Sequence, residues 1–516
     1  MSGANAWGSR LGIILAVTGS AVGLGNFLRF PGLAAKYGGG TFMIPYFTAF
    51  ILLGLPIAYI EWSIARYGGS RGYHSAPGIF SVLWPRRISP YLGVLGLIVP
   101  VGIYMYYVVI EAWCLYYAWG FLTGSLNLGT DVAGYRNFFE AFTGSAGNGA
   151  LFTGTSPMLI SLAVCYVINF FFVYRGIAGI ERISRYGMPI LLVTGLIVLV
   201  RVMTLGTPNP ALPERSVING LGHLWNPPQN VGLGESLLNA QLWMDAAGQI
   251  FFSLSVGFGV IINYASYLSK KDDIMLSATT AAAGNEFAEV ALGGLITVPA
   301  AFVFLGVQGV GSTFGLGFVS LPAVFAHMPL GQVFGFLWFF LLFIAAITSS
   351  VSMLQPGIAF LEEGLKLDRK KSSAGLLLLT ALGTLFVVYY SGKLEALDTM
   401  DFWAGTFFIF VLALFQVIVA GWLFGVDNVL KEAAEGSRMR IPRSLPFVIK
   451  YVCPAFLGLI FVMWCWQNLP VQLRKIQENT VTQITVLFLL GAIMLFLLLT
   501  HLAVKKWQTD KLKGLR

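Results

Sequence analysis

Two short runs of this chain place glycines next to hydroxyl and amide residues inside otherwise apolar segments. Residues 19–26 are GSAVGLGN, and residues 253–259 are SLSVGFG. Because each glycine costs a helix about 1 kcal/mol relative to alanine, both runs predict breaks in helices. Broken helices leave backbone carbonyls without partners, and neutral oxygens of this kind suit hard cations. The two runs therefore predict a site for cations and a small zwitterion.

The repetition of the pattern supports this interpretation. The order small-Val-Gly-apolar-Gly occurs at residues 21–25 and again at residues 255–259. A packing face of small residues between helices is the alternative interpretation of Gly19 and Gly23. Two matched runs with polar side chains favour a binding site over packing alone. Because the second run lies five apolar segments after the first, they also suggest two five-helix repeats.

The composition indicates which class of protein carries these runs. Of 516 residues, 57% are hydrophobic and 11% are charged, whereas soluble proteins carry about a quarter charged residues. This excludes a soluble enzyme, a nucleic-acid binder and a disordered scaffold. A membrane-spanning helix needs about 20 mostly apolar residues. Twelve stretches qualify: 10–36, 41–69, 89–123, 157–174, 177–201, 238–266, 274–306, 334–365, 373–391, 396–424, 445–468 and 481–504.

The distribution of Lys and Arg predicts the orientation in the membrane. If the N-terminus is inside, the inner segments hold 22 of these residues and the outer segments hold seven. Positive residues collect in cytoplasmic loops, so we expect both termini in the cytoplasm. The four cysteines lie in apolar stretches and the four histidines are scattered. Neither a metal site nor a catalytic set is predicted, so we expect no enzyme.

The same residues resemble the neurotransmitter:sodium symporter family, and within it the bacterial amino-acid transporters of the leucine-transporter type. The similar stretches follow the family order through the first ten predicted spans: 19–31, 38–40 with 44–46, 103–111, 248–259, 285–289, 348–350 and 400–403. The resemblance implies an all-α polytopic membrane protein with twelve transmembrane helices. Ten would form a 5+5 inverted repeat with broken helices 1 and 6, followed by two C-terminal helices.

The resemblance also implies where the parts of the chain begin and end. Residues 1–201 would form the first five-helix repeat, and residues 238–424 would form the second. An extracellular loop at residues 202–237 would join them, and a further extracellular loop would cover residues 307–333. Residues 425–516 would supply the two additional C-terminal helices and a cytoplasmic tail.

Two sodium sites are implied, and Na⁺ is the only cofactor that we expect. The first site would use Ala21, Asn26, Ser253 and Asn285, together with the carboxylate of the substrate. The second site would use Gly19, Val22, Ala345, Thr348 and Ser349. For the Thr348 and Ser349 hydroxyls, ordinary back-bonding within their own helix is the alternative.

The resemblance implies a substrate pocket beside the two ions. It would be formed by Ser20, Ala21, Leu24, Gly25, Ile103, Tyr107, Phe252, Ser253, Ser255, Phe258, Ser349 and Met353. No pocket position is ionisable, and an unpaired charge there would be costly, so a neutral, largely apolar amino acid is expected. An aromatic substrate stays open because methionine adapts its shape. A buried structural role is the alternative for Tyr107.

Charged residues inside the predicted spans need partners. Arg29 and Asp401 would form an extracellular gate, with Phe252 as its lid. Glu289 would supply the negative charge that chloride supplies in animal members of the family, so transport should not require chloride. Glu61 is expected to bind the backbone of the broken first span. Glu111 and Glu286 receive no role.

The inner gate departs from the family pattern. Trp7 is present, but Ala4 stands where the family has an arginine, and Glu363 replaces the usual aspartate. Arg10 or another basic residue would have to substitute, and we expect a weaker inner closure.

The resulting expectation is a secondary active transporter. It would carry out sodium-coupled, chloride-independent uptake of a neutral, mostly apolar L-amino acid by alternating access. Its partners would be the amino acid, sodium ions and the lipid bilayer, without nucleic acid, and a homodimer is open. The short tails and Glu289 suggest the cytoplasmic (inner) membrane of a prokaryote. A membrane sensor that binds an amino acid without transporting it is the competing function.

Overall fold

The structure is a computed structural model that describes residues 7–152, 156–228, 232–310 and 313–512. These residues form helices and loops, and no strand occurs among them, as an all-α protein requires. Ten of their helices are long and apolar enough to cross a membrane: Gly40–Gly69, Ser89–Thr123, Ser156–Tyr174, Ile177–Met203, Ile274–Leu305, Gly331–Leu365, Arg369–Tyr389, Gly392–Leu423, Leu445–Gln467 and Thr480–Lys511.

Two further predicted spans are broken. The first consists of α1 (Arg10–Ala21) and a second segment, Gly25–Lys36, which is bent from it by 46°. The sixth consists of α13 (Ala240–Leu254) and α14 (Val260–Ala265). The bent first span brings the number of candidate spans in the described residues to eleven. Because α13 and α14 are each too short to cross alone, the total of twelve stays a prediction.

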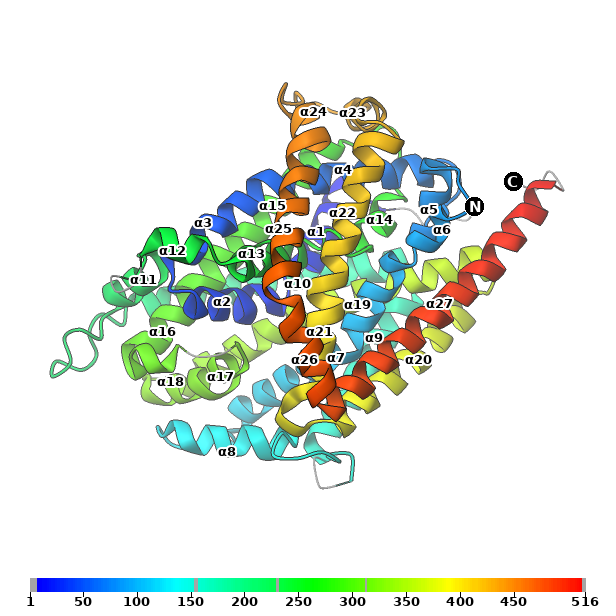
Figure 1. Cartoon of the computed structure of the whole chain (residues 1–516). Coiled ribbons are helices and arrows are strands. Elements are labelled where there is room, and N and C mark those ends of the chain that lie inside the picture. The colour runs from blue at the N-terminus through cyan, green and yellow to red at the C-terminus, as the bar shows by residue number, and fades with distance from the viewer. Residues whose placement is uncertain (1–6, 153–155, 229–231, 311–312, 513–516) are drawn as a thin grey trace.

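The helices follow one another along the chain as Figure 1 labels them. The parts of the long spans are α2 (Phe30–Lys36), α3 (Gly40–Ala49), α4 (Leu55–Gly69), α7 (Leu95–Thr123), α9 (Ser156–Tyr174), α10 (Ile177–Met203), α15 (Ile274–Glu286), α16 (Leu295–Leu305), α19 (Gly331–Leu365), α20 (Arg369–Tyr389), α21 (Glu395–Phe402), α22 (Ile409–Ile418), α25 (Cys453–Gln467) and α27 (Thr480–Leu512). Shorter helices are α5 (Ala76–Leu83), α6 (Ser89–Leu92), α8 (Val132–Thr143), α11 (Val217–Trp225), α12 (Leu233–Leu237), α17 (Thr313–Gly315), α18 (Leu321–His327), α23 (Val426–Ala434), α24 (Leu445–Phe447) and α26 (Leu469–Glu478).

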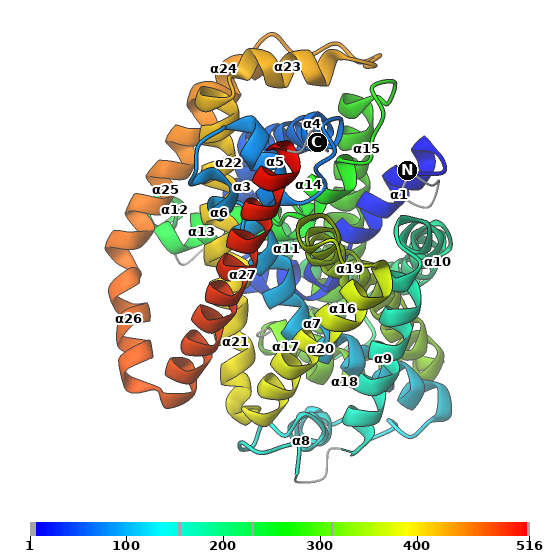
Figure 2. The same cartoon turned by 90° about the vertical axis from the view of Figure 1, so that its right-hand side faces the viewer.

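The centre of the molecule is formed by α7 and α19, which pack against each other. In the most apolar part of α7, 94% of the residues are buried inside the protein, whereas 22% are buried in the corresponding part of α27. A helix that is apolar on all sides must be covered on all sides, by protein or by lipid. Figure 2 shows α27 lying across the outside of the bundle. The first turn of α1 and the last turn of α27 lie toward the same side of the molecule (Figures 1 and 2).

Three π-helical segments lie next to the breaks and aim polar side chains at them. They are η2 (Gly25–Arg29), η4 (Phe287–Gly294) and η8 (Trp403–Phe408). A π-helical turn inserts an extra residue and rotates the side chains around it, and such turns are frequent at functional sites. These segments carry Asn26 and Arg29, Glu289, and Thr406, respectively.

Candidate functional site

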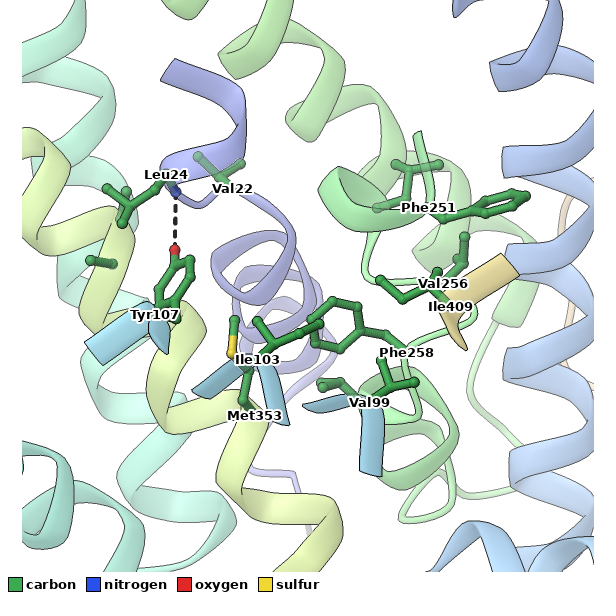
Figure 3. Packing of buried hydrophobic residues seen from close by; sticks show 14 of the residues in the cluster. Val22, Leu24, Val99, Ile103, Tyr107, Phe251, Val256, Phe258, Met353 and Ile409 are labelled. Atoms are coloured by element: carbon green, nitrogen blue, oxygen red, sulfur yellow. Dashed lines mark hydrogen bonds between the residues drawn. The ribbon is translucent and has the colours of Figure 1, made fainter. Parts of the chain in front are cut away.

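The break in the first span is held by side chains of two neighbouring elements. After α1 ends at Ala21, Val22 is extended. The Gly23 N–H donates to the Asn26 Oδ1 at 2.8 Å, and the Leu24 N–H donates to the Tyr107 hydroxyl at 3.0 Å (Figure 3). These bonds satisfy backbone donors that a continuous helix would have paired.

Gly23 also allows the break to approach the central helices closely. A Cβ atom at Gly23 would lie 2.7 Å from the Ser349 Oγ on α19 and 2.8 Å from the Tyr107 hydroxyl on α7. Any side chain at this position would therefore push the break away from both helices.

The break in the sixth span depends on backbone conformation. Ser255 has φ 55° and Gly259 has φ 89°. A Cβ atom at Gly259 would lie 2.2 Å from the Gly96 carbonyl oxygen, so only glycine fits there. The Ser255 Oγ donates to the Ser20 carbonyl at 3.1 Å and lies 3.3 Å from the Ser20 Oγ. These contacts join the two breaks.

Glu61 on α4 binds the break in the sixth span, whereas it was expected to bind the break in the first. Its Oε1 accepts a hydrogen bond from the Gly257 N–H at 2.9 Å. The prediction that it binds the backbone of the first span is therefore wrong. Sequence alone does not show which of two similar breaks lies beside α4.

Four residues expected at the first sodium site meet between the breaks. The Asn26 Nδ2 lies 2.8 Å from the Asn285 Oδ1, and the Asn285 Nδ2 lies 3.2 Å from the Ser253 Oγ. The same Asn285 oxygen lies 3.0 Å from the Ser253 carbonyl and 3.3 Å from the Ala21 carbonyl. The Asn285 oxygen and these two carbonyl oxygens would repel one another at such distances. A 180° turn of the Asn285 amide, or a cation bound between the oxygens, removes this repulsion. The set of neutral oxygens fits a hard cation such as Na⁺.

Glu289 lies directly behind this oxygen cluster and is fully buried. Its Oε1 accepts from the Gln249 Nε2 at 2.7 Å, and its Oε2 lies 3.2 Å from the Asn26 Nδ2 and 3.3 Å from the Asn285 Nδ2. None of the ion pairs in the described part of the chain includes Glu289. Its carboxyl group is therefore surrounded by amide N–H donors.

Tyr46 lies within hydrogen-bonding reach of Glu289, and its hydroxyl donates to Glu286. The distance from the Tyr46 hydroxyl to the Glu286 Oε2 is 3.0 Å. Glu286 thus has a hydrogen-bonding partner that the sequence did not suggest.

The residues expected at the second sodium site are brought together in part. The Ser349 Oγ lies 3.4 Å from the Gly19 carbonyl and 3.1 Å from the Ser20 carbonyl, where α1 ends. The Thr348 Oγ1 instead bonds within its own helix, to the carbonyls of Ile344 at 3.0 Å and Ala345 at 3.1 Å.

Val22 makes no hydrogen bond to α19 within the described residues. Its N–H bonds to the Thr18 carbonyl at 2.7 Å inside the first span. The structure thus places the end of α1 beside α19. The Thr348 hydroxyl, however, bonds to backbone carbonyls of its own helix.

A cluster of packed apolar side chains lies beside the breaks. Ile103, Phe258 and Met353 point toward one another (Figure 3), and each is buried. Phe252 packs edge-on against Phe258, with 5.8 Å between the ring centroids. A polar edge is supplied by Ser20 and Ser255. Apolar side chains and hydroxyl groups therefore meet next to the two breaks.

A cavity of about 1290 Å³ lies next to this apolar cluster and reaches Phe252. Leu24, Gly25, Tyr107 and Phe252 line it, while the buried Ile103, Phe258 and Met353 do not. Phe252 thus lines the cavity and also packs against Phe258 of the apolar cluster.

The predicted gate pair lines the same cavity. The Arg29 Nη2 is 4.0 Å from the Asp401 Oδ2, and its guanidinium stands 5.1 Å from the Phe252 ring centroid. Two further residues take part that sequence reasoning missed. The Thr406 Oγ1 accepts from Arg29 at 2.8 Å, and the Tyr106 hydroxyl donates to the Asp401 Oδ1 at 2.7 Å. The position of Tyr106 directly before Tyr107 was the only available signal.

A second polar cluster in the cavity wall is centred on Asp245. Asp245 on α13 accepts from the Lys36 Nζ at 2.9 Å and from the Tyr37 hydroxyl at 2.6 Å. The Gln241 Nε2 also donates to it, at 2.6 Å. The cluster joins α13 to the C-terminal end of the first broken span.

Trp7 and Glu363, the residues expected at the inner gate, lie on the opposite side of the molecule and bind backbone groups. The Trp7 indole donates to the Tyr264 carbonyl at 3.1 Å. Glu363 accepts from the backbone N–H groups of His74 at 2.6 Å and Ser75 at 2.9 Å, just before α5 begins. Position 4 lies outside the described residues.

Comparison with known proteins agrees with this arrangement. A profile described as "Sodium:neurotransmitter symporter family" matches residues 4–136 and 135–509. An uncharacterized sodium-dependent transporter of Methanocaldococcus jannaschii is 29% identical over 464 residues, which cover 88% of this chain and 89% of the relative. One of Haemophilus influenzae is 30% identical over 481 residues, covering 88% and 97%.

A solved structure is also similar. MhsT, crystallised in complex with L-phenylalanine, superposes with a TM-score of 0.77 at 28% identity and covers 89% of this chain and 99% of its own. Family and structural relatives are transporters and not enzymes. The chain therefore belongs to the sodium:neurotransmitter symporter family of sodium-dependent membrane transporters.

Proposed function

We propose that this protein is a symporter that couples uptake of a neutral, mostly apolar L-amino acid to two sodium ions, without chloride. The observation that carries the proposal is the meeting of Ala21, Ser253 and Asn285 between the two helix breaks, where one atom of the Asn285 amide lies 3.3 Å from the Ala21 carbonyl and 3.0 Å from the Ser253 carbonyl. A cation bound there would be coordinated by the two carbonyls and the Asn285 amide oxygen, and the carboxylate of an amino acid would complete its coordination.

Each end of the amino acid has a matching part of the site. Tyr107 and the Leu24 and Gly25 backbone would hold the substrate carboxylate, beside the first ion. The side chain would enter the pocket of Ile103, Phe258 and Met353, which has no ionisable lining. A charged side chain there would lose its hydration without a partner. MhsT binds L-phenylalanine, which supports a pocket for a large apolar side chain.

The second ion would lie where Ser349 meets the carbonyls at the end of α1. Its other ligands would be the carbonyls of Val22 and Ala345 and the hydroxyl of Thr348. This role requires the Thr348 hydroxyl to leave its bond to the Ile344 carbonyl. Because back-bonds of this kind contribute little stability, a cation can replace them.

Glu289 supports the chloride-independent part of the proposal. Its carboxyl group is bound to the same Asn26 and Asn285 amides that form the first sodium site. A fixed negative charge at this point offsets the charge of the bound sodium, so a diffusible anion is not needed.

The gate supports transport by alternating access. Arg29 and Asp401 come from different spans and are 4.0 Å apart, so their separation can control access to Phe252. We place the protein in a prokaryotic cytoplasmic membrane with both termini inside, because Lys and Arg are concentrated on that side. The 5+5 repeat and its limits at residues 201, 238 and 424 belong to the same proposal.

Flux through vesicles tests the proposal against the competing sensor function. Purified protein is reconstituted into liposomes, and uptake of labelled amino acids is followed with an inward sodium gradient and gluconate as the anion. Uptake that collapses when sodium is equal on both sides supports symport. Binding without uptake would favour a sensor, and uptake that needs chloride would remove the role of Glu289.

A further inference from the structure

A buried polar network joins three spans beside the candidate site and has no part in the function described so far. Glu111 lies on α7, one turn after Tyr107, and is fully buried. The Asn169 Nδ2 on α9 donates to its two carboxyl oxygens at 3.1 and 3.3 Å. The Asn169 Oδ1 accepts from the Ser350 Oγ on α19 at 2.8 Å. The network therefore runs from α7 through α9 to α19.

Burying polar side chains costs free energy, so such groups usually have a structural or functional role. Asn169 and Ser350 are as buried as Glu111. Cys165 and Ser350 also lie within hydrogen-bonding reach of the Glu111 carboxyl group. None of the ion pairs among the described residues includes Glu111. Apolar residues of similar size would pack at lower cost than such a network, so its value must lie in the position that it fixes.

The position that it fixes is the rotation of α19 about its own axis. Ser350 directly follows Thr348 and Ser349, and successive residues of a helix differ by about 100° in direction. Ser350 faces α9, and Ser349 faces the end of α1. Holding Ser350 therefore also determines where the preceding two hydroxyls point.

Small rotations of α19 about its axis would change the distances between its hydroxyl groups and a bound metal ion. Side-chain atoms lie about 5 Å from a helix axis, so a rotation of about 10° moves them by about 1 Å. Ligand distances in a metal site tolerate about 0.2 Å. A device that limits rotation of α19 is thus needed wherever hydroxyls of that helix bind an ion.

We propose that Glu111 is a positioning residue for the second sodium site, acting through Asn169 on Ser350 and so on the Thr348 and Ser349 hydroxyls. The inference rests on the proposed function, because it takes these two hydroxyls as sodium ligands. Glu111 touches neither the ion nor the amino acid.

The test is a titration of the purified full-length protein with ²²Na⁺ in the absence of amino acid. Without the substrate carboxylate the first site lacks a ligand, so binding reports mainly on the second. The variant E111L removes the acceptor and should raise the half-saturating sodium concentration about fivefold. E111Q keeps an acceptor oxygen for Asn169 and should restore a value within about twofold of wild type. At saturating sodium, the amino-acid Kd should be unchanged in both.

Three further variants complete the design. S350A breaks the other end of the network and should act like E111L, which keeps the test valid if E111L fails to fold. Y166F is a matched control, because it removes a partly buried bond made by α9, the helix that also carries Asn169, between the Tyr166 hydroxyl and the Thr384 Oγ1 at 2.7 Å. It should leave sodium binding unchanged. T348A removes a proposed ligand and should weaken sodium binding most.

The outcomes separate the two proposals. If T348A binds sodium like wild type, the second sodium site itself is misassigned. If T348A weakens binding but E111L and S350A do not, Glu111 has no positioning role. A general loss of amino-acid affinity and stability in E111L, without rescue by E111Q, would also overturn it. Weaker sodium binding in E111L and S350A, rescue by E111Q and no effect of Y166F would support it.

Discussion

The breaks in the first and sixth spans look alike in sequence but are stabilised differently. The first is held by hydrogen bonds that its backbone N–H groups donate to Asn26 and Tyr107, which are also proposed to bind the ion and the substrate. The sixth is held by the left-handed conformations of Ser255 and Gly259 and by the hydrogen bond from the Gly257 N–H to Glu61. The first break can therefore respond to ligands, while the sixth provides a fixed frame. This difference predicts distinct consequences of substitution.

The largest effect is expected at the sixth break, from G259A. The new Cβ atom would lie 2.2 Å from the Gly96 carbonyl, at a φ of 89°. Such a clash with strain should cost more than about 4 kcal/mol and prevent folding. Size-exclusion chromatography of the detergent extract measures the loss.

G248A in α13 is the matched control for this substitution. Its Cβ atom would meet only the Thr406 methyl group, at 3.4 Å. A folded G259A protein with wild-type recovery would show that the sixth break is not a rigid frame.

At the first break, N285A should abolish function without unfolding. It removes a proposed sodium ligand and leaves the Asn26 amide without one acceptor. We expect amino-acid affinity to fall by at least about 30-fold at fixed sodium. N428A, on the exposed α23, serves as the control. Scintillation proximity binding measures both, and wild-type affinity in N285A would remove Asn285 from the site.

E289S should convert the transporter to chloride dependence. Without the carboxylate, the bound sodium lacks its fixed negative neighbour. Uptake in gluconate should fall about tenfold or more, and chloride should restore it. E286Q, one helical turn away and bonded to Tyr46, is the control and should remain chloride-independent. Equal uptake by E289S with and without chloride would contradict the role of Glu289.

The smallest effects on amino-acid binding are expected from substitution of two neighbouring tyrosines, Tyr106 and Tyr107. Y107F removes the acceptor of the Leu24 N–H at the first break and should weaken amino-acid binding about fivefold to tenfold. Y106F removes only the bond to Asp401 in the gate. It should leave equilibrium affinity within about twofold and speed dissociation of the amino acid. Equal losses of affinity in both variants would show that the gate and the binding site do not act separately.

Much of the fold followed from local patterns. Glycine spacing predicted both breaks, and hydropathy predicted the spans, because a lipid environment requires long apolar helices. The pairing of Arg29 with Asp401 followed from the family resemblance, and their 4.0 Å separation agrees with it.

The contacts that hold the site could not be predicted in the same way. The partner of Glu61 depends on which break packs against α4, and Thr406 binds Arg29 from η8, a π-helical segment. The network of Glu111, Asn169 and Ser350 joins residues up to 239 positions apart. Such contacts arise from packing between spans, which a single sequence does not reveal.

Equilibrium binding of labelled amino acids, in sodium and then in potassium and without chloride in either, tests the central claim most directly. We predict that one neutral, apolar amino acid binds in sodium and not in potassium. Binding that is equal in the two salts would contradict the assignment of cation sites to the two helix breaks.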